Sequence, residues 1–206
     1  MARRTKADAA KTRQAIIDAA CEVFHARGVA RTSLDEVAAA AGVTRGAVYW
    51  HFKGKIDLFF AVRDNVPLPL VDGVDSELMF SLPADPLMGI EHALTSILEK
   101  LLATPALKRA HQLIAFRCEY VAELGPAFDR IYRSPHAPLL KLLTRAYKQA
   151  SVTGQLRSGV KPQQCALDTA AFINGLLTQW LVADGSSEAH RRSLRMIRDH
   201  IALRRS

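Results

Sequence analysis

The sequence predicts an all-α protein, and three observations support that prediction. Apolar residues recur at three- and four-residue steps through most of the 206-residue chain, which is the spacing of one helix face. The alternation of β-branched and polar residues that is typical of β-strands is rare, and no Asn-Gly or Asp-Gly hairpin turn links two alternating runs. Prolines open several of the apolar segments, as they do at helix starts. We expect about nine helices.

The pattern of the N-terminal part predicts a long helix at residues 8–27 followed by three shorter helices. The shorter helices are expected at residues 34–41, at residues 44–50 and from about residue 54 onward. The first carries an apolar stripe that needs a partner, and Gly28 stands where a C-terminal cap belongs. Pro67 and Pro69 bend or end the fourth helix. No element is assigned to residues 67–83.

Beyond residue 85, prolines mark the helix starts. Asp85-Pro86 and Thr104-Pro105 each place a proline at a first helical position behind a capping residue, and Gly125-Pro126 gives a further start. Pro135 and Pro138 lie inside the helix expected at residues 126–153, so we expect a kink or break near these two prolines. The expected helices are 86–103, 105–123, 126–153, 162–183 and 188–203.

Positive charge is concentrated in the first quarter of the chain. The whole sequence has 28 Lys and Arg against 20 Asp and Glu, a formal charge of +8. Residues 1–55 hold ten basic and five acidic side chains, a net +5, and the other 151 residues hold eighteen and fifteen. A basic segment of this kind is expected to meet a polyanion. We divide the chain into domains at 1–55 and 56–206.

The sequence predicts neither a membrane span nor an exported protein. Its longest apolar stretch, 169–183, is too short and too polar to cross a bilayer. The first eleven residues lack the apolar block of a secretory signal, so we expect a cytoplasmic protein. Cys21, Cys118 and Cys165 form no CxxC pair and are interpreted as reduced core thiols. No metal and no cofactor are predicted.

Residues 34–48 have the features of a helix-turn-helix. Ala38 is small enough to let two helices approach, and Gly42 can take the positive φ that reverses the chain. Val37 and Val48 are placed to hold the crossing angle between the helices. Thr44 can cap the second helix, whose N-terminus would point at DNA.

The second of these helices carries an outward face suited to reading bases. With Val48 inward, Arg45, Gly46 and Tyr49 share an arc about 100° wide. Arg45 can bond guanine O6 and N7 as a fork, and Ala47, beyond the arc, can touch a thymine methyl. Polar side chains around this face are suited to phosphate oxygens. The candidates are Ser33, Thr44, His51 and Lys55.

The sequence from residue 10 to residue 60 resembles a known DNA-binding domain. The matching residues are Ile17, Ala19, Ala20, Phe24, Gly28, Thr32-Ser33, Val37-Ala38, Ala41-Gly42-Val43, Gly46, Val48-Tyr49-Trp50-His51-Phe52, Lys55 and Leu58-Phe59. They resemble the TetR family of repressors over about a quarter of the chain. The block 44–55 is most similar to the branch that controls multidrug efflux pumps.

The resemblance implies a ligand-responsive repressor of a multidrug efflux operon. Such a protein is a homodimer that leaves a palindromic operator when a small hydrophobic molecule binds its C-terminal domain. It implies pairing of helices 162–183 and 188–203 with their copies, and we expect Trp50 and Phe52 to pack inside. A regulator of a metabolic operon is the alternative within the family.

The pocket for that molecule is expected where polar groups interrupt apolar helix surface. The candidates are His111, Gln112, Phe116, Phe172, Asn174, Leu177 and Trp180.

Two other classes of protein compete with a repressor. One is an enzyme, but the chain has no GxGxxG, GxxxxGK, HExxH or GxSxG motif, and its seven histidines lie far apart. The other is a helical interaction protein whose basic N-terminus is only a solvated surface. Arg191, Arg195 and Arg198 on the last helix are interpreted as a solvated face rather than a second nucleic-acid or membrane site.

Overall fold

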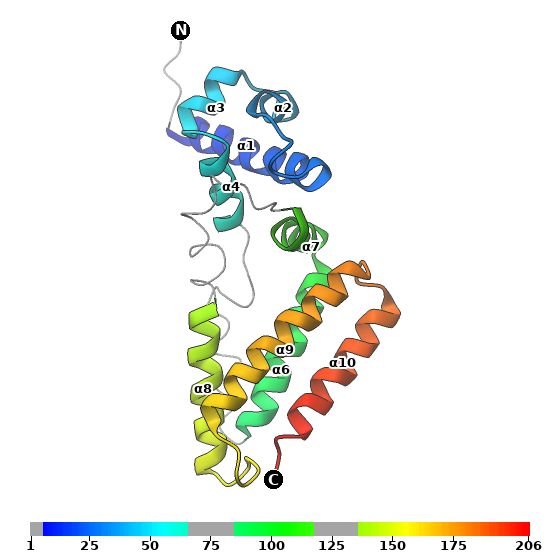
Figure 1. Cartoon of the computed structure of the whole chain (residues 1–206). Helices are drawn as coiled ribbons and strands as arrows, with labels where there is room; N and C mark the ends of the chain where they lie inside the picture. Colours follow the sequence, from blue (N-terminus) through cyan, green and yellow to red (C-terminus); the bar gives the residue numbers. More distant parts are fainter. Residues whose placement is uncertain (1–5, 66–84, 118–135) are drawn as a thin grey trace. The chain divides into compact units, whose positions relative to one another are not determined.

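The computed structural model describes residues 6–65, 85–117 and 136–206. These residues form nine α-helices and one π-helical segment, with no β-strand among them (Figure 1). The prediction of an all-α fold is confirmed. The elements are α1 (Lys6–Arg27), α2 (Leu34–Ala40), α3 (Arg45–His51), α4 (Lys55–Asp64), α6 (Pro86–Ala103), α7 (Pro105–Gln112), η1 (Leu113–Arg117), α8 (His136–Val152), α9 (Pro162–Val182) and α10 (Ser187–Ala202).

The chain divides into two compact units. One lies within residues 1–67 and 106–127, and the other within residues 68–105 and 128–206. The first, called the head, holds α1 to α4, nearly all of α7 and the π-helical segment η1. The second, called the bundle, holds α6, α8, α9 and α10.

The head is built around α1. Helices α2, α3 and α4 and the segment η1 all pack against it. Ile16, Ile17, Ala20 and Phe24 form its buried stripe, and the Phe24 ring lies 6.4 Å from the Phe59 ring of α4. Full burial of one such large side chain contributes about 1.5–3 kcal/mol, so this stripe holds the smaller helices in place.

The turn between α2 and α3 depends on Gly42. Its φ of +65° lies in the left-handed region that favours glycine, and its N–H donates to the Ala39 carbonyl over 3.2 Å. Val37 and Val48 are fully buried and Ala38 nearly so, which lets α2 and α3 pack closely. The predicted helix-turn-helix is confirmed as a structure.

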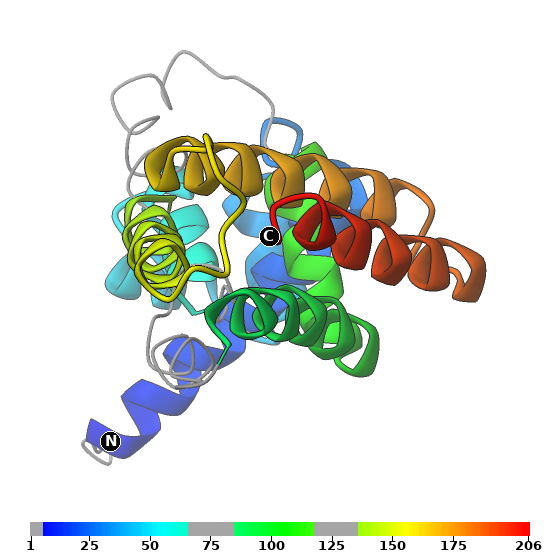
Figure 2. The same ribbon diagram turned by 90° about the horizontal axis from the view of Figure 1, so that it is seen from below.

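The bundle is a ring of four helices. Helix α6 packs on α8 and α10, and α9 packs on the same two helices, so the order around the ring is α6, α8, α9, α10 (Figure 2). Large apolar side chains from all four helices fill the interior. They include Leu87, Ile90, Leu94, Leu98, Leu143, Ile173, Trp180, Ile197 and Ile201.

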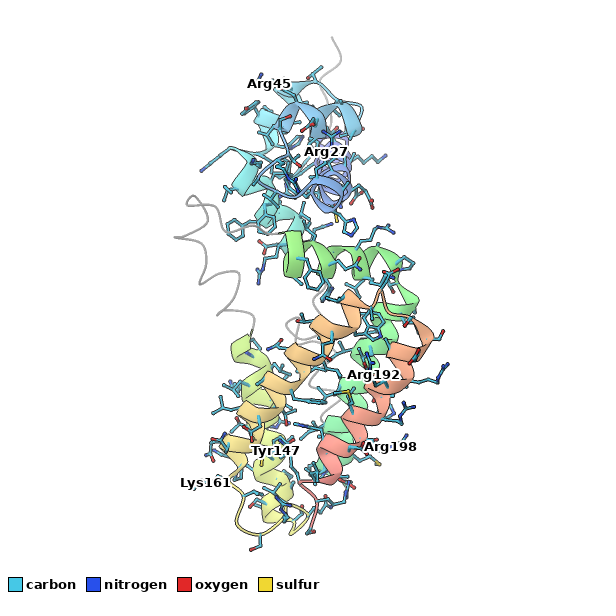
Figure 3. All side chains as sticks on the ribbon, turned by 45° about the vertical axis from the view of Figure 1, so that its right-hand side comes forward. Arg27, Arg45, Tyr147, Lys161, Arg192 and Arg198 are labelled. Atoms are coloured by element: carbon cyan, nitrogen blue, oxygen red, sulfur yellow. The ribbon has the colours of Figure 1, made fainter. Side chains whose placement is uncertain are left out.

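Three bundle helices are also joined by a short chain of polar groups. The Tyr147 hydroxyl of α8 lies 2.7 Å from Thr169 Oγ1 of α9, which lies 2.9 Å from His200 Nε2 of α10. Figure 3 shows Tyr147 on the side of α8 that faces α9. Burial raises the pKa of Tyr147 to about 12 and lowers the pKa of His200 to about 4. Both groups are therefore neutral at pH 7, and the contact buries no charge.

Helix α10 is amphipathic as predicted. Ile197 and Ile201 are buried, whereas Arg191, Arg195 and Arg198 are exposed. Figure 3 shows Arg198 on the outer side of α10, where its Nε lies 3.9 Å from a carboxylate oxygen of α6. The arginine face is solvated within the described bundle.

Two of the predicted helices, 105–123 and 126–153, lie only partly within the described residues. The prediction 105–123 is realised as α7 to Gln112, which continues as π-helix η1 to Arg117. Helix α8 is described from His136 to Val152, and the rest of the prediction 126–153, with the kink or break expected near Pro135, lies outside the described residues. Residues 67–83, 118–135 and the predicted starts within them lie outside the described residues.

The last two helices begin and end within one residue of the predictions 162–183 and 188–203. Ser186 caps α10, since its Oγ accepts the Ala189 N–H over 3.3 Å. The turn before it places Asp184 and Gly185 at positive φ, 53° and 62°. Gly185 lies directly against the Trp180 ring, whose nearest atom would be 2.6 Å from a Cβ at that position.

The described helices and cysteines bear on two expectations from composition. No helix of the described residues combines the length and the apolar character needed to cross a bilayer. Cys165 is buried as expected, Cys21 is half-buried, and Cys118 lies outside the described residues. Burial raises the pKa of both described thiols, which keeps them protonated.

Candidate nucleic-acid interface

Helix α3 presents its N-terminal half at the surface of the head. Thr44 caps it as predicted, because its Oγ1 accepts the Ala47 N–H over 3.2 Å. Val48 is the one residue that α3 buries, and Arg45 and Tyr49 are exposed. Figure 3 shows Arg45 at the surface beside α2 and α3. The residues expected to read bases therefore share one accessible face.

Arg45 is held by contacts to two elements. Its Nε lies 3.2 Å from Oδ1 of Asp35 in α2. Its Nη2 lies 3.5 Å from the Tyr49 hydroxyl, and its guanidinium carbon is 5.4 Å from the Tyr49 ring centroid. The hydrogen bond to Tyr49 and the charge of Asp35 raise the pKa of Arg45. The side chain is a permanent cation that contacts both α2 and the next turn of α3.

Gly46 and Ala47 carry little or no side chain, so the backbone of α3 is accessible at these two positions. A Cβ built at Gly46 would have Thr44 Oγ1 as its nearest described neighbour, at 3.9 Å, so packing in the head does not require glycine there. Ala47 is half-buried and adds one methyl group. A duplex can therefore approach the backbone of α3 closely at these two positions.

The residues expected to hold phosphates have different surroundings. Ser33 caps α2 in a capping box: its Oγ accepts the Glu36 N–H over 3.2 Å, and its N–H donates to Glu36 Oε2 over 2.8 Å. The hydrogen bonds that the Ser33 N–H and the Ser33 hydroxyl donate to Glu36 Oε2 lower the pKa of Glu36. Lys55 Nζ donates to the Ala30 carbonyl over 2.8 Å, and its ammonium group has two further hydrogens to offer.

Trp50 lies at the surface, so the expectation that it packs inside is wrong. It is 73% exposed, whereas Phe52 is 2% exposed and buried as expected. At 100° per residue Trp50 points about 200° away from Val48, and Phe52 only about 40°. Since Val48 faces the core, the helix itself directs Trp50 outward. The Arg13 guanidinium covers the Phe52 ring at 5.1 Å.

A hollow of about 280 Å³ opens beside this face, between α1 and α3. Ala9, Ala47, Trp50 and His51 line it, and the His51 ring meets the Trp50 ring edge to face with centroids 4.5 Å apart. Methyl groups and ring edges suit the apolar parts of a nucleotide, its deoxyribose or a thymine methyl. The hollow lies beside the face expected to read bases, on the side of α1.

The chain matches two protein-family models over most of its length. Residues 16–62 match the model described as bacterial regulatory proteins, tetR family. Residues 90–205, more than half of the chain, match the model described as BetI-type transcriptional repressor, C-terminal. The chain belongs to the TetR family. This TetR-family protein is a DNA-binding transcriptional regulator, so the enzyme alternative is excluded.

The most similar relatives of this TetR-family regulator include two repressors. It is 36% identical over 179 residues to the HTH-type transcriptional repressor BepR of Brucella suis, covering 87% of this chain and 85% of BepR. The crystal structure of NalD, the secondary repressor of the MexAB-OprM multidrug efflux pump in Pseudomonas aeruginosa, has a TM-score of 0.81 and 31% identity. That similarity covers 96% of this chain and 97% of NalD.

Three residues expected in the effector pocket lie in the head. His111 Nδ1 donates to the Leu107 carbonyl over 2.9 Å, and burial lowers the pKa of His111, which keeps the ring neutral. Gln112 Oε1 lies 3.2 Å from His25 Nε2 of α1. Phe116 in η1 is exposed.

The other four pocket candidates lie in the bundle. Phe172 stacks on His200 with ring centroids 4.0 Å apart, Asn174 is half-buried, and Leu177 and Trp180 are buried. The seven candidates are divided between the two units, so their convergence on one pocket stays a prediction. A separate hollow of about 650 Å³ lies along α8 and includes none of them among its described lining. That lining is Leu140, Lys141, Thr144, Arg145, Lys148 and Gln149.

Sequence reasoning also missed Asp35. An acidic residue in the first turn of a helix is ordinary, because it complements the helix dipole. Asp35 lies ten positions before Arg45 on a different helix, and only the crossing of α2 and α3 brings the two side chains to 3.2 Å. Trp50, by contrast, could have been placed outward from the helical period alone.

Proposed function

We propose that this regulator represses a multidrug efflux operon by binding a palindromic operator through α3. The observation that carries the proposal is the exposed face of α3, on which Arg45 and Tyr49 lie together beside the hollow lined by Trp50. Efflux control is supported by similarity to NalD and to SmeT, the repressor of the Stenotrophomonas maltophilia pump SmeDEF. Residues 1–55 would contact DNA, and residues 56–206 would bind the effector and form the dimer.

The roles of individual residues follow from their places on the head. The Arg45 fork would pair with guanine, the low surface at Gly46 and Ala47 would admit the base edges, and Tyr49 would contact the adjacent base. The caps of α2 and α3, the last residue of α3 and the first residue of α4 would hold the DNA backbone. Those phosphate-binding residues are Ser33, Thr44, His51 and Lys55.

The homodimer would form through α9 and α10. Five small or apolar residues of α9 are exposed and fall within an arc of about 80°. A Cβ at Gly175, within this stripe, would have no described atom within 4 Å, so the subunit itself does not require glycine there. Close approach of a second copy would explain the small residue. The stripe consists of Leu167, Ala171, Gly175, Thr178 and Val182.

A dimer of this kind sets the form of the operator. Two α3 helices that enter successive major grooves on one side of a duplex lie roughly 34–36 Å apart, so the half-sites would be arranged as a pseudo-palindrome. An effector that binds better to a dimer with another spacing weakens DNA binding by that same difference in free energy. A typical coupling weakens binding about 5- to 150-fold.

The effector would be a small hydrophobic molecule. SmeT, whose complex with triclosan is known, is 30% identical to this chain with a TM-score of 0.73, covering 91% of this chain and 90% of SmeT. Triclosan is therefore a suitable first probe. Its contacts would come from the candidates His111, Gln112, Phe116, Phe172, Asn174, Leu177 and Trp180.

A DNA-binding titration of the full chain tests the proposal. Duplexes selected from a random library, and the DNA upstream of the protein's own gene, are titrated at two salt concentrations by fluorescence anisotropy. We expect a palindrome to be preferred, with affinity falling steeply as salt rises. Arg45→Ala should cost about 1–3 kcal/mol and relax the base preference at one position per half-site. Arg157→Ala, which removes the same charge from an exposed site in the bundle, should leave the preference intact.

Triclosan is then added to the complex with the selected palindrome. Release of the duplex at concentrations that leave the fold intact would support effector control. Equal affinity of the wild-type protein for all duplexes would refute the repressor function. Tight binding to a palindrome that lies beside metabolic genes, with no response to triclosan, would instead favour the metabolic alternative.

A further inference from the structure

Arg45 is fixed from two sides before any DNA is bound. The carboxylate of Asp35 lies against its Nε, and the Tyr49 ring and hydroxyl lie against its Nη2 side. Asp35 comes from the first turn of α2, and Tyr49 lies one turn further along α3. The orientation of the guanidinium group is therefore set jointly by the two helices of the helix-turn-helix.

The contact with Asp35 leaves a particular edge of Arg45 available. A guanidinium group has five N–H donors, and the fork to guanine can use either the two Nη atoms or Nε with one Nη. Asp35 lies against Nε, and the Tyr49 hydroxyl can accept only one of the two Nη2 hydrogens. The other Nη2 hydrogen and Nη1 are therefore left for a base, which makes the end of the guanidinium group the available edge. We propose that Asp35 is a positioning and specificity-determining residue that holds Arg45 for end-on pairing with guanine, an inference that rests on the proposed function.

A stabilising role does not account for this pair. The Arg45 side chain is 65% exposed and that of Asp35 58%, and ion pairs at such exposed sites contribute little to folding. A carboxylate on a surface that faces phosphates also weakens binding to every duplex through charge repulsion. Asp35 complements the dipole of α2, but its pairing with Arg45 is unfavourable for general affinity, and the gain that we infer from that pairing is in selectivity.

The selectivity follows from what Arg45 does on different duplexes. On a duplex with guanine at the matching position, Arg45 keeps its contact with Asp35 and gains the fork to O6 and N7. On other duplexes Arg45 either stays without a base partner or turns to a phosphate, which leaves Asp35 unpaired beside the DNA backbone. Asp35 therefore lowers binding to the wrong sequences more than binding to the right one.

The test compares four forms of the full chain: wild type, Asp35→Asn, Arg45→Ala and the double variant. Each is used to select duplexes from a random library, and affinities are then measured at one salt concentration. The duplexes are the best wild-type palindrome, the same palindrome with its preferred guanine replaced, and an unrelated sequence. Asp18→Asn is the matched control, since Asp18 is an exposed carboxylate of α1 that accepts a hydrogen bond from Gln14 instead.

We expect the wild type to prefer guanine by about 5- to 150-fold, the range of one good fork. Asp35→Asn should bind the unrelated duplex more tightly and show a guanine preference at least about threefold smaller than that of the wild type. Asp18→Asn should keep that preference. In the Arg45→Ala background, Asp35→Asn should leave base preference unchanged, because Asp35 acts through Arg45.

Three results would overturn the inference. Asp35→Asn and Asp18→Asn could change the affinity for every duplex by one common factor, which would mean that Asp35 acts only through its charge at long range. Asp35→Asn could change the preferred base in the Arg45→Ala background, in which case Asp35 reads a base directly, as a carboxylate can with cytosine N4. If the wild type selects no sequence at all, the proposed function is wrong as well. In the first two cases the wild-type palindrome preference, and with it the proposed function, stands.

Discussion

Gly185 illustrates how a single position can be restricted both by backbone conformation and by packing. Its φ of 62° is strained for any residue with a side chain, and a Cβ would lie 2.6 Å from the buried Trp180 ring. Gly154 has a similar φ, 71°, but a Cβ there would meet no described atom within 4 Å. The two glycines therefore separate the cost of strain from the cost of a clash.

Gly185→Ala should lower the free energy of unfolding by about 1–3 kcal/mol more than Gly154→Ala does, because only the first forces Trp180 to move. Gly154→Ala should itself cost about 1–2 kcal/mol, the cost of the left-handed conformation. Urea unfolding followed by far-UV circular dichroism measures both. Equal losses for the two variants would show that the contact with Trp180 is not restrictive.

His200 gives the bundle a defined pH dependence. Burial and the neighbouring Arg204 charge lower its pKa to about 4, and Asp168 opposes that shift. In the unfolded chain a histidine takes up its proton near pH 6.5. Between about pH 6.5 and 4 the unfolded state therefore binds more protons than the folded state, and stability falls as the pH falls through that window.

Replacing His200 should reduce this acid sensitivity. His200→Gln keeps a polar group for Thr169 but cannot be protonated, so the drop in urea midpoint from pH 7 to pH 5 should be smaller than in the wild type. Part of the drop should remain, because burial also lowers the pKa of His111. His92→Gln, at an exposed position of α6, is the control. An unchanged drop in His200→Gln would mean that His200 is already protonated in the folded bundle at pH 5.

At the scale of elements, the short helix α3 is kept in place by its ends as much as by its core. It buries only Val48, and Thr44 supplies its cap. Capping side chains contribute about 1 kcal/mol, and Asp and Asn serve as well as Thr. The same hydroxyl lies at the helix N-terminus, where the dipole favours a phosphate. Folding and binding therefore make different demands on this residue.

Two substitutions at Thr44 separate those demands. Thr44→Asn and Thr44→Asp should both keep the thermal unfolding midpoint within about 2–4 °C of the wild type, since both residues cap a helix. Thr44→Asp should bind the selected palindrome at least about tenfold more weakly, because its carboxylate repels the phosphate. Thr44→Asn should bind nearly as the wild type does. If both bind alike, no phosphate approaches this end of α3.

The association of α7 with α1 shows that packing and function need not divide the chain at the same place. Arg109 lies 3.1 Å from Glu22, and His25 lies 3.2 Å from Gln112, so α7 is fastened to the first helix of the head. The proposed functional division at residue 55 leaves α7 with the effector-binding part. A movement of α7 would act directly on α1, and through it on α2 to α4.

At the scale of the whole molecule, the decisive property is assembly. No residue within 6–65, 85–117 or 136–206 covers the small and apolar stripe on α9, and its Val182 is 70% exposed. TetR-family regulators act as dimers on operator DNA. In the proposed α9 interface a side chain at Gly175 would occupy the space that the partner helix needs, whereas no described atom of the subunit lies within 4 Å of a Cβ there.

Gly175→Leu should therefore convert the dimer to a monomer that still folds. Sedimentation velocity should show half the wild-type mass, and the helical circular dichroism signal should be unchanged, since leucine favours helix over glycine by about 1 kcal/mol. The affinity for the palindrome should fall to the affinity of one subunit for a single half-site. Ser151→Leu, at an exposed position of α8, should remain dimeric. A Gly175→Leu protein that stays dimeric would place the interface elsewhere.

Much of this protein follows from its sequence alone, because the responsible interactions are local. The all-α fold, the caps at Ser186 and Thr44, the turn at Gly42 and the extent of the last two helices depend on residues within a few positions of one another. The family match in the helix-turn-helix has the same basis. The helical period even contained the correct position of Trp50, which we had assigned to the core by analogy.

Only the tertiary structure decided the contacts between distant residues. Asp35 meets Arg45, His25 meets Gln112, and Tyr147 reaches His200 through Thr169, and in each case the partners come from different helices. Such pairs depend on how helices cross, and the crossing is set by the summed packing of many buried side chains rather than by any short motif. The sequence therefore determined which surface is suited to DNA, and the packing of α2 on α3 determined how Arg45 is held on it.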